Sequence, residues 1–217
     1  MAAITRVNEL GAIVDISQLS KQAALQAIEL SWAPVLATHS NVMTLSRATR
    51  NLSDEEIDQI GATGGVVHVA PFRGYLFDSS DPQLDADIRA ARRAAGVKED
   101  YLYPFELYWE IEDPAAQAEF LGAVSALLED IGIEAMLDHI DYIAKRVGAK
   151  HVCLGSDYDG WLPAIPNDMK DCRDIVKITQ GLIDRGYSDD EIGGILYRNA
   201  VRVFEEAWSA RDKSARP

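Results

Sequence analysis

Short apolar runs recur at four places along the chain. They are rich in Val, Ile, Leu and Ala, show little polar alternation, and span residues 11–16, 34–38, 65–70 and 151–155. Runs of this kind are typical of parallel strands that are covered on both faces. We therefore predict four buried parallel strands, in which the buried side chains include Ile13, Val35, Leu36, Val67, Val69, Val152 and Leu154.

Helical patterns separate these runs. They cover residues 4–10, 19–30, 53–61, 115–131, 133–147 and 188–208. Two of them begin with a capping box, at Ser53 and at Ser188, each with a Glu three residues later. A strand followed by a helix, repeated four times, indicates an α/β fold with a parallel sheet and right-handed crossovers.

The connection after the third run is much longer than an ordinary loop between a strand and a helix. We predict a mostly helical insertion over about residues 73–133, between the third and fourth strands. Its aromatic side chains are Tyr75, Tyr101, Tyr103, Tyr108 and Trp109. Packing of the insertion onto the sheet is the favoured interpretation of these side chains, and a wall of a substrate site is the alternative.

Composition narrows the class of protein. A chain of 217 residues with 47% hydrophobic residues predicts one globular domain over 1–217. The net charge of −14 argues against nucleic acid or an anionic membrane as partner. We find no apolar stretch long enough to span a membrane and no secretory signal. With only Cys153 and Cys172 present, we expect a protein of the reducing cytoplasm.

In parallel α/β folds, chemistry gathers where the strands end. The polar groups to inspect therefore follow the apolar runs: residues 15–18 after the first, 39–41 after the second and 156–160 after the fourth. The third run contributes His68, followed by residues 71–73.

Several of these segments resemble the membrane dipeptidase (renal dipeptidase) family of zinc peptidases. The segments are VDISQLS, PVLATHSNVMTLSRATRNLSDEEI, DHIDYIAKRVGAKHVCLGSDYDG and YRNAVRVFEE. The resemblance implies a (β/α)8 barrel, two zinc ions that share a bridging carboxylate, and hydrolysis of dipeptides.

The resemblance also implies roles for three residues. His39 corresponds to a ligand of the second zinc, Arg50 to the group that binds the free carboxylate of the substrate, and Asp157 to the catalytic aspartate beside the metal-bound hydroxide. Imidazole is a good zinc ligand, and a guanidinium matches a carboxylate with two parallel hydrogen bonds. A carboxylate near the site can orient water and carry its proton to the leaving amine.

The chain departs from the family pattern in two ways. The family's His-x-Asp pair and bridging Glu belong to the N-terminal half of the barrel, whereas this chain begins at a helix leading into the fifth strand. We therefore expect the C-terminal half of a TIM-type barrel, with four parallel βα units. In addition, Gln18 stands 21 residues before His39, where the family has a zinc-binding His. Because an amide oxygen is a poor zinc ligand, we expect weak zinc binding by this chain alone.

Each remaining histidine has a structural interpretation. His68 is expected to pack inside the barrel, and His139 to make a structural hydrogen bond suggested by the neighbouring Asp138 and Asp141. His151 is expected at the surface. A mononuclear metal site formed by His39, His68 and Asp157 is a weaker alternative.

The other candidates have structural alternatives as well. Arg50 could pair with Asp54 or Glu55 on the surface instead of binding a carboxylate. Asp15 is expected to hydrogen-bond the turn that it ends, and Asp159 to cap the turn at Gly160.

Two functions remain open. The first is a zinc dipeptidase whose substrate is a dipeptide and whose activity is incomplete in this chain alone. The second is a non-catalytic half barrel that pairs with itself or with a companion N-terminal half, because four parallel strands expose two edges.

Overall fold

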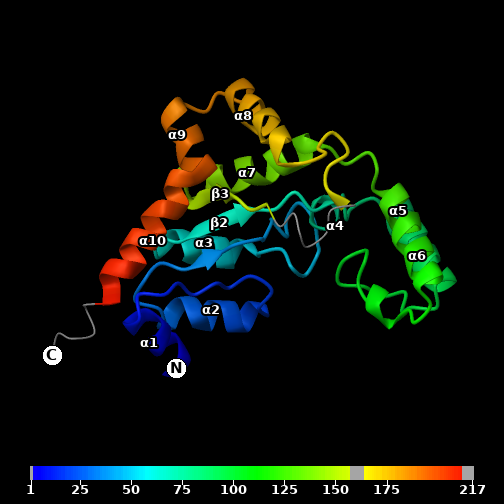
Figure 1. The fold of residues 1–217 in the computed structure, drawn as a ribbon, viewed down its shortest axis with the longest axis horizontal. Helices are drawn as coiled ribbons and strands as arrows, with labels where there is room; N and C mark the ends of the chain where they lie inside the picture. Colours follow the sequence, from blue (N-terminus) through cyan, green and yellow to red (C-terminus); the bar gives the residue numbers. More distant parts are fainter. Residues whose placement is uncertain (1, 157–163, 212–217) are drawn as a thin grey trace.

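The structure is a computed structural model that describes residues 2–156 and 164–211. Its strands are β1 (Leu36–Ala37), β2 (Val66–Val69) and β3 (Val152–Leu154). Its α-helices are α1 (Ala2–Glu9), α2 (Lys21–Leu30), α3 (Asp54–Ala62), α4 (Arg73–Leu76), α5 (Pro82–Ala94), α6 (Pro114–Leu127), α7 (Ile133–Val147), α8 (Ile175–Asp184), α9 (Asp189–Gly193) and α10 (Asn199–Ala210). The described part is thus an α/β fold with many helices and a small parallel sheet (Figure 1).

The sheet has the order β1-β2-β3, with Leu36 opposite Val66 and Val67 opposite Val152. The prediction of a strand over 11–16 is wrong, since this segment forms only a single parallel bridge between Asp15 and Leu36.

The bridge ends because side-chain and turn contacts replace the next rung of the ladder. Leu36 donates to the Val14 carbonyl at 3.0 Å, and Ile16 donates to the Leu36 carbonyl at 2.8 Å. The amide of Thr38 then donates to the Asp15 carboxylate at 3.2 Å, while the Ile16 carbonyl accepts from Leu19. Sequence pattern alone cannot show that Asp15 takes the Thr38 amide.

Helices cover the sheet in two ways. One face of the sheet packs against α2, α3 and α7 in the largest hydrophobic cluster. Val203 of α10 packs instead with Leu36, Val66 and Cys153, whose side chains alternate with those of the first face. Figure 1 shows α10 at the end of the sheet where the strands begin, so the opposite end is left for the polar residues that follow the strands.

Most of the predicted core is confirmed. The buried side chains include Val35, Leu36, Val67, Val69 and Val152. The prediction is wrong for Ile13 and Leu154, which are only partly buried. Ile13 lies in the segment that forms no strand, and Leu154 lines a cavity.

Both capping boxes are present, at Ser53 and at Ser188. The helix predicted over 188–208 differs, because it is interrupted by a π-helical turn over Gly194–Arg198. Asn199, just after that turn, donates to the carbonyls of Ala149 and Val152, both at 2.8 Å. The turn therefore anchors α10 beside β3, the edge strand of the described sheet.

The predicted insertion contains α4, α5 and α6 and has a hydrophobic cluster of its own. Its aromatic rings contact one another, as Phe72 does Tyr75 with ring centroids 4.6 Å apart. The buried Arg92 donates to the carbonyls of Lys98, Pro104 and Glu106 and so fixes the loop after α5. In Figure 1, α5 and α6 stand to one side of the sheet.

Two histidines are buried. His139 makes a structural hydrogen bond, as predicted, but its partner is the backbone of Val42, whose amide donates to Nδ1 at 2.9 Å. The surface position predicted for His151 is wrong, because this side chain is buried with Nδ1 at 2.7 Å from the Gly65 carbonyl. Its place between the starts of β2 and β3 explains its burial.

Acid should destabilise the fold through His139. Burial lowers the pKa of its imidazole from 6.5 to about 3 in the folded chain. The unfolded chain therefore binds a proton that the folded chain does not, so stability present above the unfolded pKa is lost as the pH falls toward the folded one. Over this window, the free energy of unfolding should fall by about 1.4 kcal/mol per pH unit.

His139→Asn is the matched variant, because its amide oxygen can still accept from Val42 but binds no proton. Urea unfolding should show a lower stability for the variant at neutral pH and a shallower loss on acidification. The pKa of His151 is also lowered, mainly by burial. His151 is present in both the unmodified chain and the variant, so its effect on the loss of stability in acid is the same in both. Equal slopes for the two chains would contradict the prediction.

Within the described ranges, no helix is both long and apolar enough to cross a membrane. Cys153 is buried and Cys172 exposed, and neither forms a disulfide. Cys153 serves as a small apolar core residue, packed with Leu36, Val66 and Val203.

Candidate functional site

Polar residues gather at the end of the sheet where the strands end. Thr38 and His39 follow β1, and Asp15 lies beside β1 through the parallel bridge. The end of β3 comes close as well, because a Cβ at Gly155 would lie 2.6 Å from the carbonyl oxygen of Thr38. The carboxyl ends of the strands therefore form one continuous surface.

Gln18 connects His39 with Arg50. The amide nitrogen of Gln18 lies 2.7 Å from Nε2 of His39, and its amide oxygen accepts a hydrogen bond from Nη1 of Arg50. Because a guanidinium can only donate, the amide oxygen must face Arg50 and the NH2 group must face His39. The amide therefore donates to Nε2 of His39, so this nitrogen carries the lone pair.

The other ring nitrogen of His39 contacts Thr38. Nδ1 lies 2.9 Å from the Thr38 hydroxyl, which donates to Oδ2 of Asp15 at 2.6 Å. Since Nε2 accepts, these partners assign the ring proton to Nδ1. The hydrogen bonds then run in one direction, from the guanidinium of Arg50 through Gln18, His39 and Thr38 to the carboxylate of Asp15.

Asp15 also hydrogen-bonds a turn, but the turn follows Asp15 instead of ending at it: the Asp15 carboxylate accepts from the amide of Ser17 at 3.0 Å. Burial raises the pKa of this carboxyl, but the hydrogen bonds from Thr38 and Ser17 outweigh burial and hold the pKa below its ordinary value. Asp15 thus stays ionised and keeps an acceptor at the end of the hydrogen-bond chain.

The backbone of Gln18 has φ 65°, in the left-handed region that residues other than glycine seldom adopt. Such a conformation costs about 1–3 kcal/mol and persists only where its surroundings determine it. The contacts of the Gln18 side chain with His39 and Arg50 provide such surroundings.

Arg50 is half-buried and does not pair with the acids offered as its alternative partners. Asp54 pairs with Arg146 at 3.0 Å and Glu55 with Lys21 at 2.7 Å. The guanidinium of Arg50 lies over the ring of Tyr103, 5.6 Å from its centroid. An aromatic side chain of the insertion therefore reaches the site, a contact that sequence spacing could not reveal.

Two other candidates are not joined to this chain of hydrogen bonds. The Nε2 atom of His68, on β2, is buried without a hydrogen-bond partner, and burial lowers the pKa of this imidazole. This agrees with the packed role predicted for it. Asp157 and Asp159 lie outside the described residues, so the prediction that Asp157 shares a cleft with His39 and Arg50 stays a prediction.

The chemistry of the described side chains does not complete a zinc site. Across residues 2–156 and 164–211, no group of three or more His, Cys, Asp and Glu side chains is placed to hold a metal ion. At this edge His39 is the side chain with strong zinc affinity, and the Gln18 amide donates to its Nε2 lone pair. The guanidinium beside Gln18 also disfavours a second cation.

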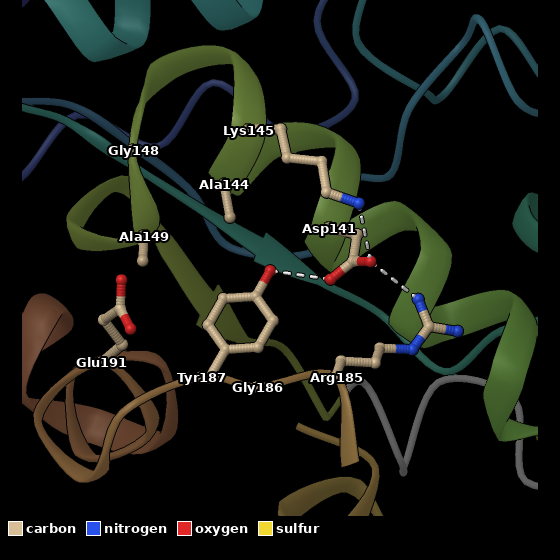
Figure 2. Close-up of a pocket in the computed structure, with 9 residues that line it drawn as sticks. All are labelled: Asp141, Ala144, Lys145, Gly148, Ala149, Arg185, Gly186, Tyr187 and Glu191. Atoms are coloured by element: carbon tan, nitrogen blue, oxygen red, sulfur yellow. Dashed lines mark hydrogen bonds and ion pairs between the residues drawn. The ribbon is translucent and has the colours of Figure 1, made fainter. Parts of the chain in front are cut away.

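A hollow of about 330 Å³ lies elsewhere, between the end of α7 and the loop after α8 (Figure 2). Three of its polar side chains are paired with a fourth, the carboxylate of Asp141. Asp141 accepts from Tyr187 at 2.7 Å, from Arg185 at 3.0 Å and from Lys145 at 3.1 Å. These contacts tie the loop to α7, so we interpret the hollow as structural.

Fold and site together define a class: an α/β protein with its polar side chains at the carboxyl ends of a parallel sheet, as in barrel enzymes. The sequence matches the model of the membrane dipeptidase family, peptidase family M19, over residues 1–217. The chain belongs to this family.

Curated relatives include the dipeptidase ataJ of Aspergillus terreus, which is 29% identical over 196 residues. That alignment covers 90% of this chain and 36% of the relative. The dipeptidase aclJ of Aspergillus oryzae is 27% identical over 94% of this chain and 37% of its own length. The chain thus spans little more than a third of these two curated relatives.

Two solved structures are similar to this chain. The probable dipeptidase PvdM of Pseudomonas aeruginosa is 33% identical, with a TM-score of 0.78 over 96% of this chain and 54% of that one. A metallopeptidase of Rhodobacter sphaeroides, solved with a phosphinate mimic of the dipeptide L-Ala-D-Ala, is 23% identical. Its TM-score is 0.68 over 95% of this chain and 46% of that one, which shows the likeness of the fold.

Proposed function

We propose that this chain contributes to hydrolysis of dipeptides, by binding the free carboxylate of the substrate through Arg50. Family membership supports the substrate class. The single observation that carries the proposal is that Gln18 holds Arg50 and His39 together at the carboxyl ends of the strands. A guanidinium offers five donors and matches a carboxylate with two parallel hydrogen bonds.

In this proposal, Asp157 is the catalytic aspartate. It follows Gly155 by two residues in the sequence, and β3, which ends at Leu154, runs toward this edge of the sheet. Its carboxylate would accept a proton as the oxygen of water attacks the carbonyl carbon of the peptide bond. The carbon–nitrogen bond then breaks, and the same proton passes to the leaving amine.

The described residues supply only part of the ligand set that the family's two zinc ions need. Of the described residues at this edge, His39 alone is proposed as a zinc ligand, and a catalytic zinc usually has three protein ligands. The other ligands of a two-zinc site would have to come from outside the described residues. We therefore propose that the chain alone binds zinc weakly. It should bind dipeptides but hydrolyse them slowly or not at all.

Equilibrium dialysis against a radiolabelled Ala-Ala dipeptide tests the proposal. The chain, freed of metal by a chelator, should retain dipeptide in proportion to its concentration and release it when excess unlabelled dipeptide is added. A chain that retains no dipeptide, with or without added zinc, would refute it.

A second candidate role, pairing of two copies without catalysis, is favoured by one observation. Exposed apolar side chains form a row along the last two helical segments at spacings of four, three and four: Tyr197, Val201, Phe204 and Trp208. This is the spacing of a coiled-coil seam. In an antiparallel pair, Arg198 of one copy would face Glu205 of the other, which makes the row complementary to itself.

Molar mass in solution tests this second role. The unmodified chain should show the mass of two chains by light scattering, and Phe204→Glu should show the mass of one. Val176→Glu, at an exposed position on α8, is the control and should stay paired. A single-chain mass for the unmodified protein at tens of micromolar would exclude the pairing.

A further inference from the structure

We propose that the insertion positions Arg50 for the substrate carboxylate, with Tyr103 as the positioning residue. The guanidinium of Arg50 lies over the face of the Tyr103 ring, with Cζ 5.6 Å from the ring centroid. The face of an aromatic ring is its electron-rich side and attracts a cation. This inference rests on the proposed function, because it concerns how the same site holds its carboxylate-binding group.

The loop that carries Arg50 is bound to the insertion on both sides of this residue. The backbone amide of Thr49 donates to the carbonyl of Leu102 at 3.0 Å. The side-chain amide of Asn51 donates to the carbonyl of Tyr75 at 2.9 Å. Three consecutive residues therefore contact the insertion, so the place of the guanidinium depends on the insertion as well as on the sheet.

The ring of Tyr103 is itself held by its surroundings. It makes T-shaped contacts with Tyr75 and Phe72, with ring centroids 6.0 and 6.3 Å apart. The loop beside it is fixed by the buried Arg92, which donates to the carbonyl of Pro104 at 3.1 Å. These contacts lie within the chain and fix the ring independently of any ligand.

Gln18 and Tyr103 hold the guanidinium of Arg50 without neutralising its charge. Gln18 contacts it through a neutral amide oxygen. Burial raises the pKa of the Tyr103 hydroxyl above its ordinary value of 10.0, so this group is also uncharged at neutral pH. A carboxylate in either place would pair with the guanidinium and compete with the substrate. These two contacts instead leave the positive charge available.

Holding Arg50 in place reduces the entropy that is lost on binding. A long side chain that is ordered only when the ligand arrives weakens the affinity, whereas a side chain already held by its neighbours does not. The gain falls on ligands that use the guanidinium. A dipeptide with a free carboxylate should therefore benefit from Tyr103, and a dipeptide amide should not.

The test measures the preference for Leu-Leu over Leu-Leu amide by calorimetric titration. Tyr103→Leu removes the aromatic face and should weaken binding of Leu-Leu by about fivefold or more, with binding of the amide unchanged. Tyr103→Phe keeps the aromatic face and should keep the preference. Trp109→Leu, at an exposed position of the same insertion, is the control and should keep it as well.

A second variant without the ring guards against a failure to fold. Tyr103 is only partly buried, and the flexible side chain of methionine can fill much of the space that its ring leaves. Tyr103→Met should therefore lose the preference as Tyr103→Leu does. Thermal unfolding of each variant shows which of them are folded.

The outcomes separate this inference from the proposed function. If the unmodified chain binds Leu-Leu and its amide equally, or binds neither, the proposed function fails and this inference fails with it. If the unmodified chain prefers Leu-Leu and the variants without the ring keep that preference, the proposed function stands and Tyr103 does not position Arg50. Equal losses in Tyr103→Phe and Tyr103→Leu would also overturn the inference, because the aromatic face would then not be the cause.

Discussion

Replacing Arg50 with methionine should weaken dipeptide binding by about a hundredfold or more, because the carboxylate loses a charged, bidentate partner. Arg50→Lys keeps the charge but not the planar pair of donors, so a loss of about tenfold is expected. Both values are measured by calorimetric titration of a dipeptide into each variant. The order unmodified chain, Lys variant, Met variant is the signature of carboxylate binding.

Arg47→Met is the matched control, since Arg47 lies in the same segment with its side chain exposed. It should bind dipeptides like the unmodified chain. Thermal unfolding of each variant checks that the fold is intact. If Arg50→Met bound dipeptides with unchanged affinity, the role assigned to Arg50 would be wrong.

Replacing Gln18 with histidine should tighten zinc binding by at least about tenfold. The variant presents a second imidazole beside His39 and removes the amide that donates to Nε2 of His39. Turnover should remain absent, because two imidazoles without a bridging carboxylate leave the ion largely hydrated. Zinc content after dialysis against a mild chelator measures the change.

Gln18→Leu separates the effect of the added imidazole from the effect of losing the Gln18 amide. It removes the amide that competes for Nε2 of His39 without adding a zinc ligand. It should gain much less zinc affinity than Gln18→His. Two tightly held zinc ions in the unmodified chain, together with dipeptide hydrolysis, would show that the ligand set is complete and that the role given to Gln18 is wrong.

Patterns that depend on local sequence predicted their structures well. Both capping boxes exist because Ser and Glu three residues apart satisfy the first backbone amides of a helix without help from the rest of the chain. The parallel runs around Val35, Val67 and Val152 are buried because continuous apolar sequence can be covered on both faces.

Features that depend on distant contacts were not predictable. The strand at 11–16 is lost because Asp15 takes the amide of Thr38, and His151 is buried because helices and strands from elsewhere surround it. Tyr103 reaches Arg50 only through the fold of the insertion. The family resemblance implied that Gln18 and His39 belong to one site, but only their hydrogen bonds show that the amide donates to the imidazole.

The central claim is that this chain recognises the free carboxylate of a dipeptide. The most direct test is a calorimetric titration of the unmodified chain with Leu-Leu and with Leu-Leu amide, which differ in that carboxylate alone. The account predicts that the amide binds at least about tenfold more weakly. Equal affinity for the two peptides would contradict it.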